Sequence, residues 1–533
     1  MKHLLLRLWL GLCVAAMLIP LGVILAALGE FDAEIWDFLL EFQLPELLKN
    51  TAFLLISVGI GVIWLGTTSA WLTAMYDFPL RRFFFWGLML PLAMPAYVLA
   101  FTQLGLFDYT GPVSTFLRDN WGWEQGLPDI RNRWGLAAVM SLTFYPYVYL
   151  LSRNAFGSMG QRALEVGASF GLSPAQSFWR VALPMARPWI AGGTVLALME
   201  TLADFGTVSV FSYDTFTTAI YQAWFDFFSL QTAKQLAALL ITAVFVLLAL
   251  EQLSRGGRRF TQAGKAQQQR RKALSGSRKW LATLYCALIL IAAFILPLLQ
   301  LLAWIQQTWH SHFNEALWLH IWHSLIISLA AAVVTAAVAL LLALAKRILH
   351  TKGAALAARI ATLGYGIPGT VLAVGVFVPL AWADNHLVAW LGLPEGSAVI
   401  KGTLWVMLAA YIIRFLAVAY SSAEAGLERI GRSQEEAAHS LGVTGWRMVR
   451  RIHLPLLKGA LGTAMLMVFV DVMKEMPITL MTRPYDWDTL ATRIYTFTTE
   501  GQYDYAALPA LVMVITGLIP VILFSRLDEK KHA

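Results

Sequence analysis

The sequence has little charge and almost no cysteine. Only 14% of its 533 residues are Asp, Glu, Lys or Arg, whereas 58% are hydrophobic, and this composition is typical of membrane proteins. The two cysteines, Cys13 and Cys286, fall inside apolar runs that are far apart in the sequence. A disulfide framework and a cysteine-rich metal site are therefore excluded.

The sequence also lacks the phosphate-binding motif of ATPases. It contains no G-x-x-x-x-G-K-[ST] segment, and Gly264-Lys265 has neither the upstream glycine nor the following hydroxyl residue. The chain therefore cannot hold nucleotide phosphates in a P-loop. If ATP drives its activity, another polypeptide must bind the nucleotide.

Long apolar runs are abundant instead. The run SLIISLAAAVVTAAVALLLALA, which begins at Ser324, is long enough to cross about 30 Å of hydrocarbon as a helix. The first run follows Lys2, His3 and Arg7 and is too long for a signal peptide, so we expect an uncleaved first span. We predict an all-α polytopic membrane protein with about twelve transmembrane helices. The predicted spans are 4–28, 51–75, 82–107, 134–157, 189–212, 235–254, 280–304, 322–346, 358–383, 402–423, 459–482 and 505–526.

A basic segment, 255–279, separates a first half of six spans, 1–254, from a second half of six, 280–533. The segment has no acidic residue and is rich in Gly, Gln and Ser, so we expect it to be flexible. Its charge places it in the cytoplasm by the positive-inside rule, and the net charge of +8 needs no nucleic-acid partner. Counting spans outward from it places both termini, 158–188 and 424–458 in the cytoplasm.

The two halves repeat the same landmarks. An offset of 271 residues aligns Gly171 with Gly442, and an offset of 273 aligns 95–100 with 368–373. Each half has an even number of spans, so both copies have the same orientation. The halves should therefore be related by an axis along the membrane normal, with a pathway between them.

A cytoplasmic loop with the same spacing occurs in each half. In the first copy Gly171 can end a helix in the left-handed conformation, and Ser173 can cap the next helix in a capping box closed by Gln176. In the second copy Thr444 takes the capping position and Gly445 follows. A single copy could be a basic amphipathic helix on lipid head groups, but two copies indicate a docking element for a two-fold partner.

In the second copy, Glu436-Ala437-Ala438 is followed by Gly442 and then by Leu454-Pro455. This pattern resembles the EAA loop of ABC importer permeases, the membrane subunits of binding-protein-dependent transport systems. The first copy has Val166-Gly167 where Ala-Ala is usual. The resemblance implies the type I permease fold in the bacterial inner membrane and a coupling helix that enters a groove on an ATPase. It also implies two ATPase copies that bind ATP and Mg, a periplasmic solute-binding protein, and no cofactor on this chain. The expected coupling residues are Glu165, Gly171, Ser173, Leu183, Pro184, Glu436, Ala437, Ala438, Gly442, Thr444, Leu454 and Pro455.

Five charged residues are grouped in the fifth and eleventh predicted spans. Glu200 and Asp204 are one turn apart in the fifth span, and Asp471, Lys474 and Glu475 lie in the corresponding part of the eleventh. An ionised group at a helix centre costs roughly 2.5–3.5 kcal/mol on insertion scales. We therefore expect these residues to line a translocation pathway or to pair with each other, Lys474 with Asp471 and Glu475. The acidic pairs suit a metal cation or an organic cation, although no firm set of metal ligands is defined.

The segment 471–495 resembles the corresponding segment of ferric-iron permeases, through Lys474-Glu475-Met476-Pro477 and Asp488-Thr489-Leu490-Ala491-Thr492. The resemblance implies transport of iron(III) delivered by a periplasmic binding protein. Thiamine permeases share the fused layout, and polyamine or sulfate systems share the loop, so these substrates stay open.

Two other classes of protein are alternatives. In a proton-coupled secondary transporter, Asp204 or Glu475 would carry protons. A membrane enzyme would use the carboxylates as acid and base, but no His-rich or Ser/His group accompanies them. We therefore expect a transport subunit and not an enzyme.

Overall fold

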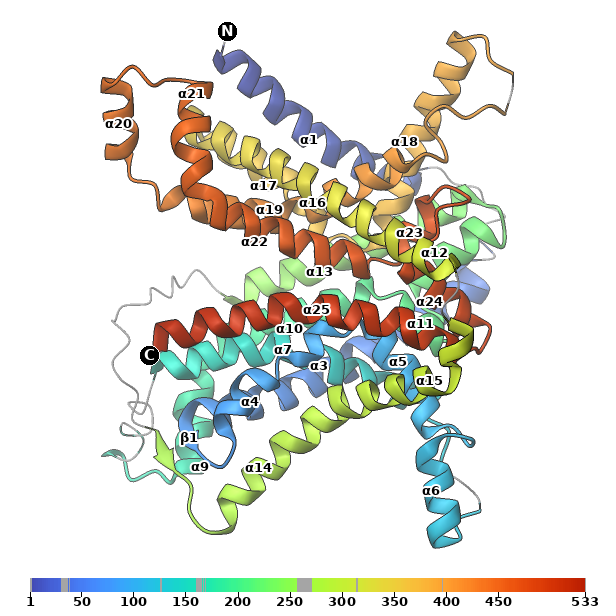
Figure 1. Ribbon diagram of the computed structural model, residues 1–533, viewed down its shortest axis with the longest axis vertical. Coiled ribbons are helices and arrows are strands. Elements are labelled where there is room, and N and C mark those ends of the chain that lie inside the picture. Colours follow the sequence, from blue (N-terminus) through green and yellow to red (C-terminus); the bar gives the residue numbers. More distant parts are fainter. Residues whose placement is uncertain are drawn as a thin grey trace. The chain divides into compact units, whose positions relative to one another are not determined.

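The computed structural model describes residues 2–29, 37, 39–124, 127–159, 165, 167, 169–255, 271–312, 315–394 and 396–532. This part of the chain is almost entirely helical (Figure 1). Eleven of its helices are long and apolar enough to cross a membrane, and one bent helix pair can supply a twelfth span. The predicted all-α class and the approximate number of spans are confirmed.

Most elements come in pairs, one from each half. The elements before the basic segment are α1 (Lys2–Ala26), η1 (Ala27–Gly29), η2 (Leu39–Gln43), α3 (Leu44–Met75), β1 (Tyr76–Asp77), α4 (Arg81–Gly87), η3 (Leu90–Ala93), α5 (Ala96–Phe107), α6 (Pro112–Trp121), α7 (Arg133–Met159), α9 (Pro174–Ser177), η4 (Phe178–Ala182), α10 (Leu183–Ala203), α11 (Gly206–Val210), α12 (Phe216–Phe225) and α13 (Leu230–Arg255). The later elements are β2 (Lys272–Ala273), α14 (Ser277–Leu290), η5 (Ile291–Ile295), α15 (Leu296–His312), α16 (Glu315–Leu349), α17 (Lys352–Ala361), η6 (Leu363–Gly366), α18 (Gly369–Trp390), α19 (Leu404–Glu428), α20 (Arg432–Ser440), α21 (Trp446–Met448), η7 (Val449–His453), α22 (Leu454–Lys474), α23 (Pro477–Thr482), α24 (Leu490–Thr499) and α25 (Tyr503–His532).

Each of the two compact units takes helices from both halves of the sequence. The first contains Met1–Ala33, Ala219–Ile241 and Phe313–Tyr495, and the remaining segments form the second. In the first unit α1 packs against α16, α17 and α18. Ile24 of α1 lies so close to Gly375 of α18 that a Cβ added at this glycine would be 2.8 Å from Ile24 Cδ1. Small residues allow such close helix packing in membranes. The predicted division into the halves 1–254 and 280–533 describes the sequence repeats and stays a prediction. The compact units do not coincide with these halves.

In the second unit the helices α3, α7 and α10 pack together. Val148 of α7 lies against two glycines, because a Cβ at Gly66 would be 2.6 Å from Val148 Cβ and one at Gly193 2.7 Å from Val148 Cα. Tyr145 and Tyr149 are fully buried and donate hydrogen bonds of 2.8 Å to the carbonyls of Leu88 and Phe85. Their polar ends are thus satisfied within an apolar core.

The spans predicted at 82–107 and 358–383 are not continuous helices. Short 3-10 helices, η3 and η6, end before Pro95 and Pro368, whose backbones are extended with ψ angles of 144° and 142°. In the first half the axis bends by 96° at this break. Proline removes a backbone donor and disfavours helical geometry in the residue before it, which explains both breaks.

The spans predicted at 189–212 and 459–482 also end early. α10 stops at Ala203 and α22 at Lys474, and the chain resumes in the short helices α11 and α23. The apolar run continues across the break, and hydropathy does not register it. The first non-helical residues are Asp204 and Glu475, whose backbones are extended.

Four short π-helices share one local cause. Each of η2, η4, η5 and η7 ends two residues before a proline. A proline ring collides with the carbonyl four residues earlier and donates no hydrogen bond, so a wider turn accommodates it inside a helix. The four prolines are Pro45, Pro184, Pro297 and Pro455.

Part of the basic segment, 256–270, lies outside the described residues, so its predicted flexibility stays a prediction. At its end, β2 pairs in parallel with β1, matching Lys272 with Tyr76 and Ala273 with Asp77. The Leu274 amide also donates to the Asp77 carbonyl at 3.0 Å. The carboxyl end of the segment is therefore held by the chain that follows α3.

Candidate functional site

The first loop (165–184) and the second loop (435–455) make the same turn. Gly171 and Gly442 have φ angles of 70° and 74°, the left-handed region that glycine adopts without strain. The Leu172 amide donates to the Gly167 carbonyl and the Val443 amide to the Ala438 carbonyl, each at 2.9 Å. This bond is the one that closes a Schellman helix end, so the predicted helix stop is present in both copies.

The helix after each turn begins differently. In the first loop the Ser173 amide donates to Gln176 Oε1 at 2.9 Å and the Gln176 amide to Ser173 Oγ at 3.3 Å, which is the predicted capping box. In the second loop α21 is capped by Gly445, with φ 59° and ψ −133°. Such angles are available essentially to glycine alone. The assignment of Thr444 as the cap is therefore wrong by one residue.

Both loops lead through a π-helix directly into a long helix. Leu183-Pro184 opens α10 and Leu454-Pro455 opens α22, and each of these helices has 21 residues. Because the π-helix and the long helix are continuous, each loop is joined to its membrane helix without a flexible link.

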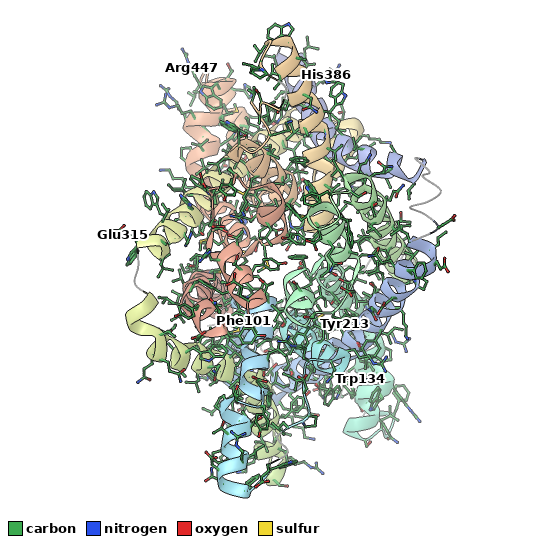
Figure 2. All side chains as sticks on the ribbon, turned by 90° about the vertical axis from the view of Figure 1, so that its right-hand side faces the viewer. Phe101, Trp134, Tyr213, Glu315, His386 and Arg447 are labelled. Carbon is green, nitrogen blue, oxygen red and sulfur yellow. The ribbon has the colours of Figure 1, made fainter. Side chains whose placement is uncertain are left out.

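An ion pair and a hydrogen bond hold the second loop. Arg347 Nε, in the last turn of α16, lies 2.9 Å from Glu435 Oε1, and His453 Nε2 lies 2.8 Å from the same oxygen. The neighbouring Glu436 and Ala437 are exposed, whereas Ala438 is buried. Arg347, Glu435 and His453 are not among the predicted coupling residues, because the family pattern begins at Glu436. Figure 2 shows Arg447 of α21, whose side chain is exposed.

Aromatic packing holds the first loop instead. Phe178 contacts Trp71 of α3 and Phe156 of α7, with ring centroids 4.9 and 6.4 Å apart. A Cβ at Gly167 would lie 2.7 Å from Ser177 Cβ, which explains why this copy has glycine where alanine is usual. Glu165 is exposed, and Val166 lies outside the described residues.

Asp204 and Glu475 occupy equivalent positions and receive backbone hydrogen bonds from the helix that follows. Asp204 Oδ1 accepts from the amides of Thr207 and Val208 at 2.9 and 3.2 Å. Glu475 Oε1 accepts from the Ile478 amide at 3.3 Å. Each carboxylate thus caps the short helix after the break in its span.

Glu475 also has a cationic partner that sequence reasoning missed. Arg414 Nε of α19 lies 3.3 Å from Glu475 Oε2, and both side chains are largely buried. The sequence carried a sign of this pair, because Arg414 is the lone charged residue of its predicted span. The neighbouring cations of Asp471 are Lys474 and Arg414. The remaining candidate, Glu200, is half-buried on α10, and the predicted pathway role of these residues stays a prediction.

The family model for the inner membrane component of binding-protein-dependent transport systems matches two segments, 62–250 and 336–531. The chain belongs to this family. Each matched segment contains one loop and two broken membrane spans, and the predicted resemblance to this family is confirmed. The chain is a multi-pass inner membrane component of a transport system.

Three curated relatives show how far the similarity extends. The Fe(3+)-transport system permease protein FbpB 2 of Haemophilus influenzae is 29% identical over 97% of this chain and 98% of its own length. The ferric transport system permease protein FbpB of Actinobacillus pleuropneumoniae is 22% identical over 82% of this chain and 64% of its own length. The sulfate transport system permease protein CysT of Salmonella typhimurium is 29% identical but covers only 36% of this chain and 68% of its own length.

Proposed function

We propose that the chain is the permease of an ATP-driven importer that moves iron(III) from a periplasmic binding protein into the cytoplasm. The assignment of iron(III) as the substrate rests on the end-to-end similarity to a ferric permease, which extends over 97% of this chain and 98% of that relative. The sulfate permease is similar over only 36% of the chain.

One ATPase subunit docks on each loop. Phe170 and Leu441 directly precede the turning glycines at the same repeat position, and their side chains are 77% and 81% exposed. A large apolar side chain held in water on a rigid turn is suited to insertion into a partner's groove. ATP and Mg bind to these two subunits, because this chain has no P-loop, and the chain itself holds no cofactor.

The long helices transmit the movement of the loops. A helix of the length of α10 or α22 spans roughly 30 Å, and it joins the loop to Asp204 or Glu475 without a break. When ATP closes the ATPase dimer, the loops approach each other and the far ends of both helices are displaced. The binding protein docks on the outer segments 108–133 and 483–504, and both termini lie in the cytoplasm.

The test is uptake by liposomes that contain the permease, its ATPase and the iron-loaded binding protein. We expect iron to accumulate only when ATP is inside. Accumulation of thiamine or sulfate in place of iron would refute the assignment of iron(III) as the substrate. Uptake driven by a proton gradient with no ATPase present would establish the secondary transporter instead.

A further inference from the structure

The sequence Asp-Thr-x-x-Thr-x-Ile-Tyr occurs twice, at 214–221 and at 488–495, with an offset of 274 residues. Each copy opens a ten-residue helix, α12 or α24. The Thr215 amide donates to Thr218 Oγ1 and the Thr489 amide to Thr492 Oγ1, each at 2.9 Å. The two helices therefore begin with the same cap.

The same neighbour also fixes each helix. Asn50 Nδ2 donates to the Asp214 carbonyl at 3.0 Å, and His323 Nδ1 lies 3.1 Å from the Asp488 carbonyl. Asn50 of α3 and His323 of α16 occupy the same repeat position, at the offset of 273 residues. The repeated segment is thus built and held alike in both halves.

Each copy of the segment ends in a tyrosine, and the two tyrosines touch. The ring centroids of Tyr221 and Tyr495 are 6.0 Å apart, at an interplanar angle of 68°. Their hydroxyls are hydrogen-bonded to each other, and both side chains are half-buried within one compact unit. Equivalent residues of a two-fold repeat can meet only beside the axis that relates the copies. The two phenol oxygens therefore stand where the parallel repeat predicts a pathway.

The surroundings of the pair are aromatic. Tyr221 lies against Phe225, and Trp224 against Phe377 of α18, with centroids 4.9 and 4.7 Å apart. Burial raises the pKa of Tyr221, and the neighbouring Tyr495 raises it further. An ordinary phenol is neutral at pH 7.

Two charged side chains act on Tyr221 from nearby, Asp226 and Arg483. The positive charge of Arg483 is offset by its ion pair with Asp488. In this unit α12 and α24 lie at the end opposite to α20 and α21 (Figure 1). If the second loop is cytoplasmic, the tyrosine pair is therefore on the outer side.

We propose that the hydroxyl oxygens of Tyr221 and Tyr495 are a transient ligand pair for ferric iron at the outer end of the pathway, an inference that rests on the proposed iron transport. Hard cations prefer oxygen ligands. Each phenol that binds iron gives its proton to water, so two phenolates offset two of the three positive charges while the iron stays ferric. A pair of ligands leaves other positions to water or a carrier anion, and weak binding permits release.

The experiment compares Tyr221→Phe, Tyr495→Phe and the double variant with wild type. Tyr365→Phe is the control, because Tyr365 is 37% exposed and lies outside the segments proposed to dock the binding protein. Phenylalanine keeps the ring packing and removes only the hydroxyl. Ferric nitrilotriacetate is added to the purified permease, and the visible phenolate-to-iron charge-transfer band is recorded. We expect the band in wild type and Tyr365→Phe, a weaker band in each single variant, and its loss in the double variant.

Iron uptake is measured with the same variants in liposomes that contain the ATPase and the loaded binding protein. We expect the double variant to lose most uptake while the binding protein still stimulates ATP hydrolysis. Normal iron uptake by the double variant, or a charge-transfer band that persists in it, would refute the proposed ligand pair. The proposed function in iron transport would then still stand. Failure of the wild-type protein to import iron overturns the proposed function, and the ligand pair with it.

Discussion

Arg347 and Glu435 join the end of a membrane helix to the second loop. The Arg347 guanidinium lies 2.9 Å from the Glu435 carboxylate and also donates to the Ile430 carbonyl at 2.6 Å. The same carboxylate oxygen lies 2.8 Å from His453, at the end of η7. One acidic side chain therefore connects α16, α20 and the entry to α22. The second loop cannot shift against these helices without breaking the connection.

Removing Arg347 should loosen the second loop. The side chains of Arg347 and Glu435 are 18% and 21% exposed, so Arg347→Ala leaves a mostly buried carboxylate with His453 as its remaining partner. We expect the ordered conformation of the loop to lose about 1–3 kcal/mol of stability. Fewer iron ions should then be transported for each ATP hydrolysed. The exposed Lys352→Ala serves as the control. An unchanged ratio of uptake to hydrolysis in Arg347→Ala would show that the connection does not serve coupling.

The turning glycine of the second loop is required for its conformation. At Gly442 a Cβ would meet no atom within 4 Å, but φ is 74°, and an alanine there costs about 1–2 kcal/mol through the left-handed backbone alone. Gly459 on α22 also has free space around a Cβ, and its φ lies outside the positive range. We expect Gly442→Ala to reduce ATP-dependent uptake and Gly459→Ala to leave it unchanged, as measured in liposomes with membrane insertion verified. Equal uptake by the two variants would contradict a role for the turn.

The exposed residues of the loops should bind the ATPase. Leu441→Asp removes the apolar contact and Glu436→Lys reverses an exposed charge, and neither change breaks a contact that the structure gives within the chain. We expect both variants to reach the membrane and to retain less ATPase on purification. Trp390→Asp is a matched control for Leu441→Asp, because Trp390 is also 81% exposed and lies outside both loops. If Leu441→Asp and Trp390→Asp retain equal amounts of ATPase, the docking assignment is wrong.

Asp204 offers a test that separates capping from transport. Asp204→Asn keeps an oxygen that can accept from the amides of Thr207 and Val208 and removes the charge, whereas Asp204→Ala removes both. We expect Asp204→Ala to lower the free energy of unfolding by about 0.5–2 kcal/mol and Asp204→Asn to lower it much less. Uptake should fall in both variants if the charge serves the pathway. Wild-type uptake by Asp204→Asn with unchanged melting temperature would limit the carboxylate to its capping role.

The sequence predicted those features that depend on neighbouring residues. Apolar runs gave the spans because a helix in a membrane must be apolar over its whole length. Gly171 and Gly442 marked the turns because few other residues adopt a positive φ, and Ser173 with Gln176 marked the cap through a fixed spacing. The helix breaks at Pro95 and Pro368 were not predicted, because the apolar run continues across each of them. Proline is nevertheless a local sign of such a break.

By itself, then, the sequence determined the spans, the repeat and the two loops, since each follows from local composition and from an offset within the chain. Only the tertiary structure decided that α1 packs with the second half, that Arg414 pairs with Glu475, that Arg347 reaches Glu435 and that Tyr221 meets Tyr495. The physical reason is common to all four. The apolar faces of membrane helices are chemically alike, so the choice of neighbour, and with it the meeting of polar groups distant in sequence, arises only when the helices pack.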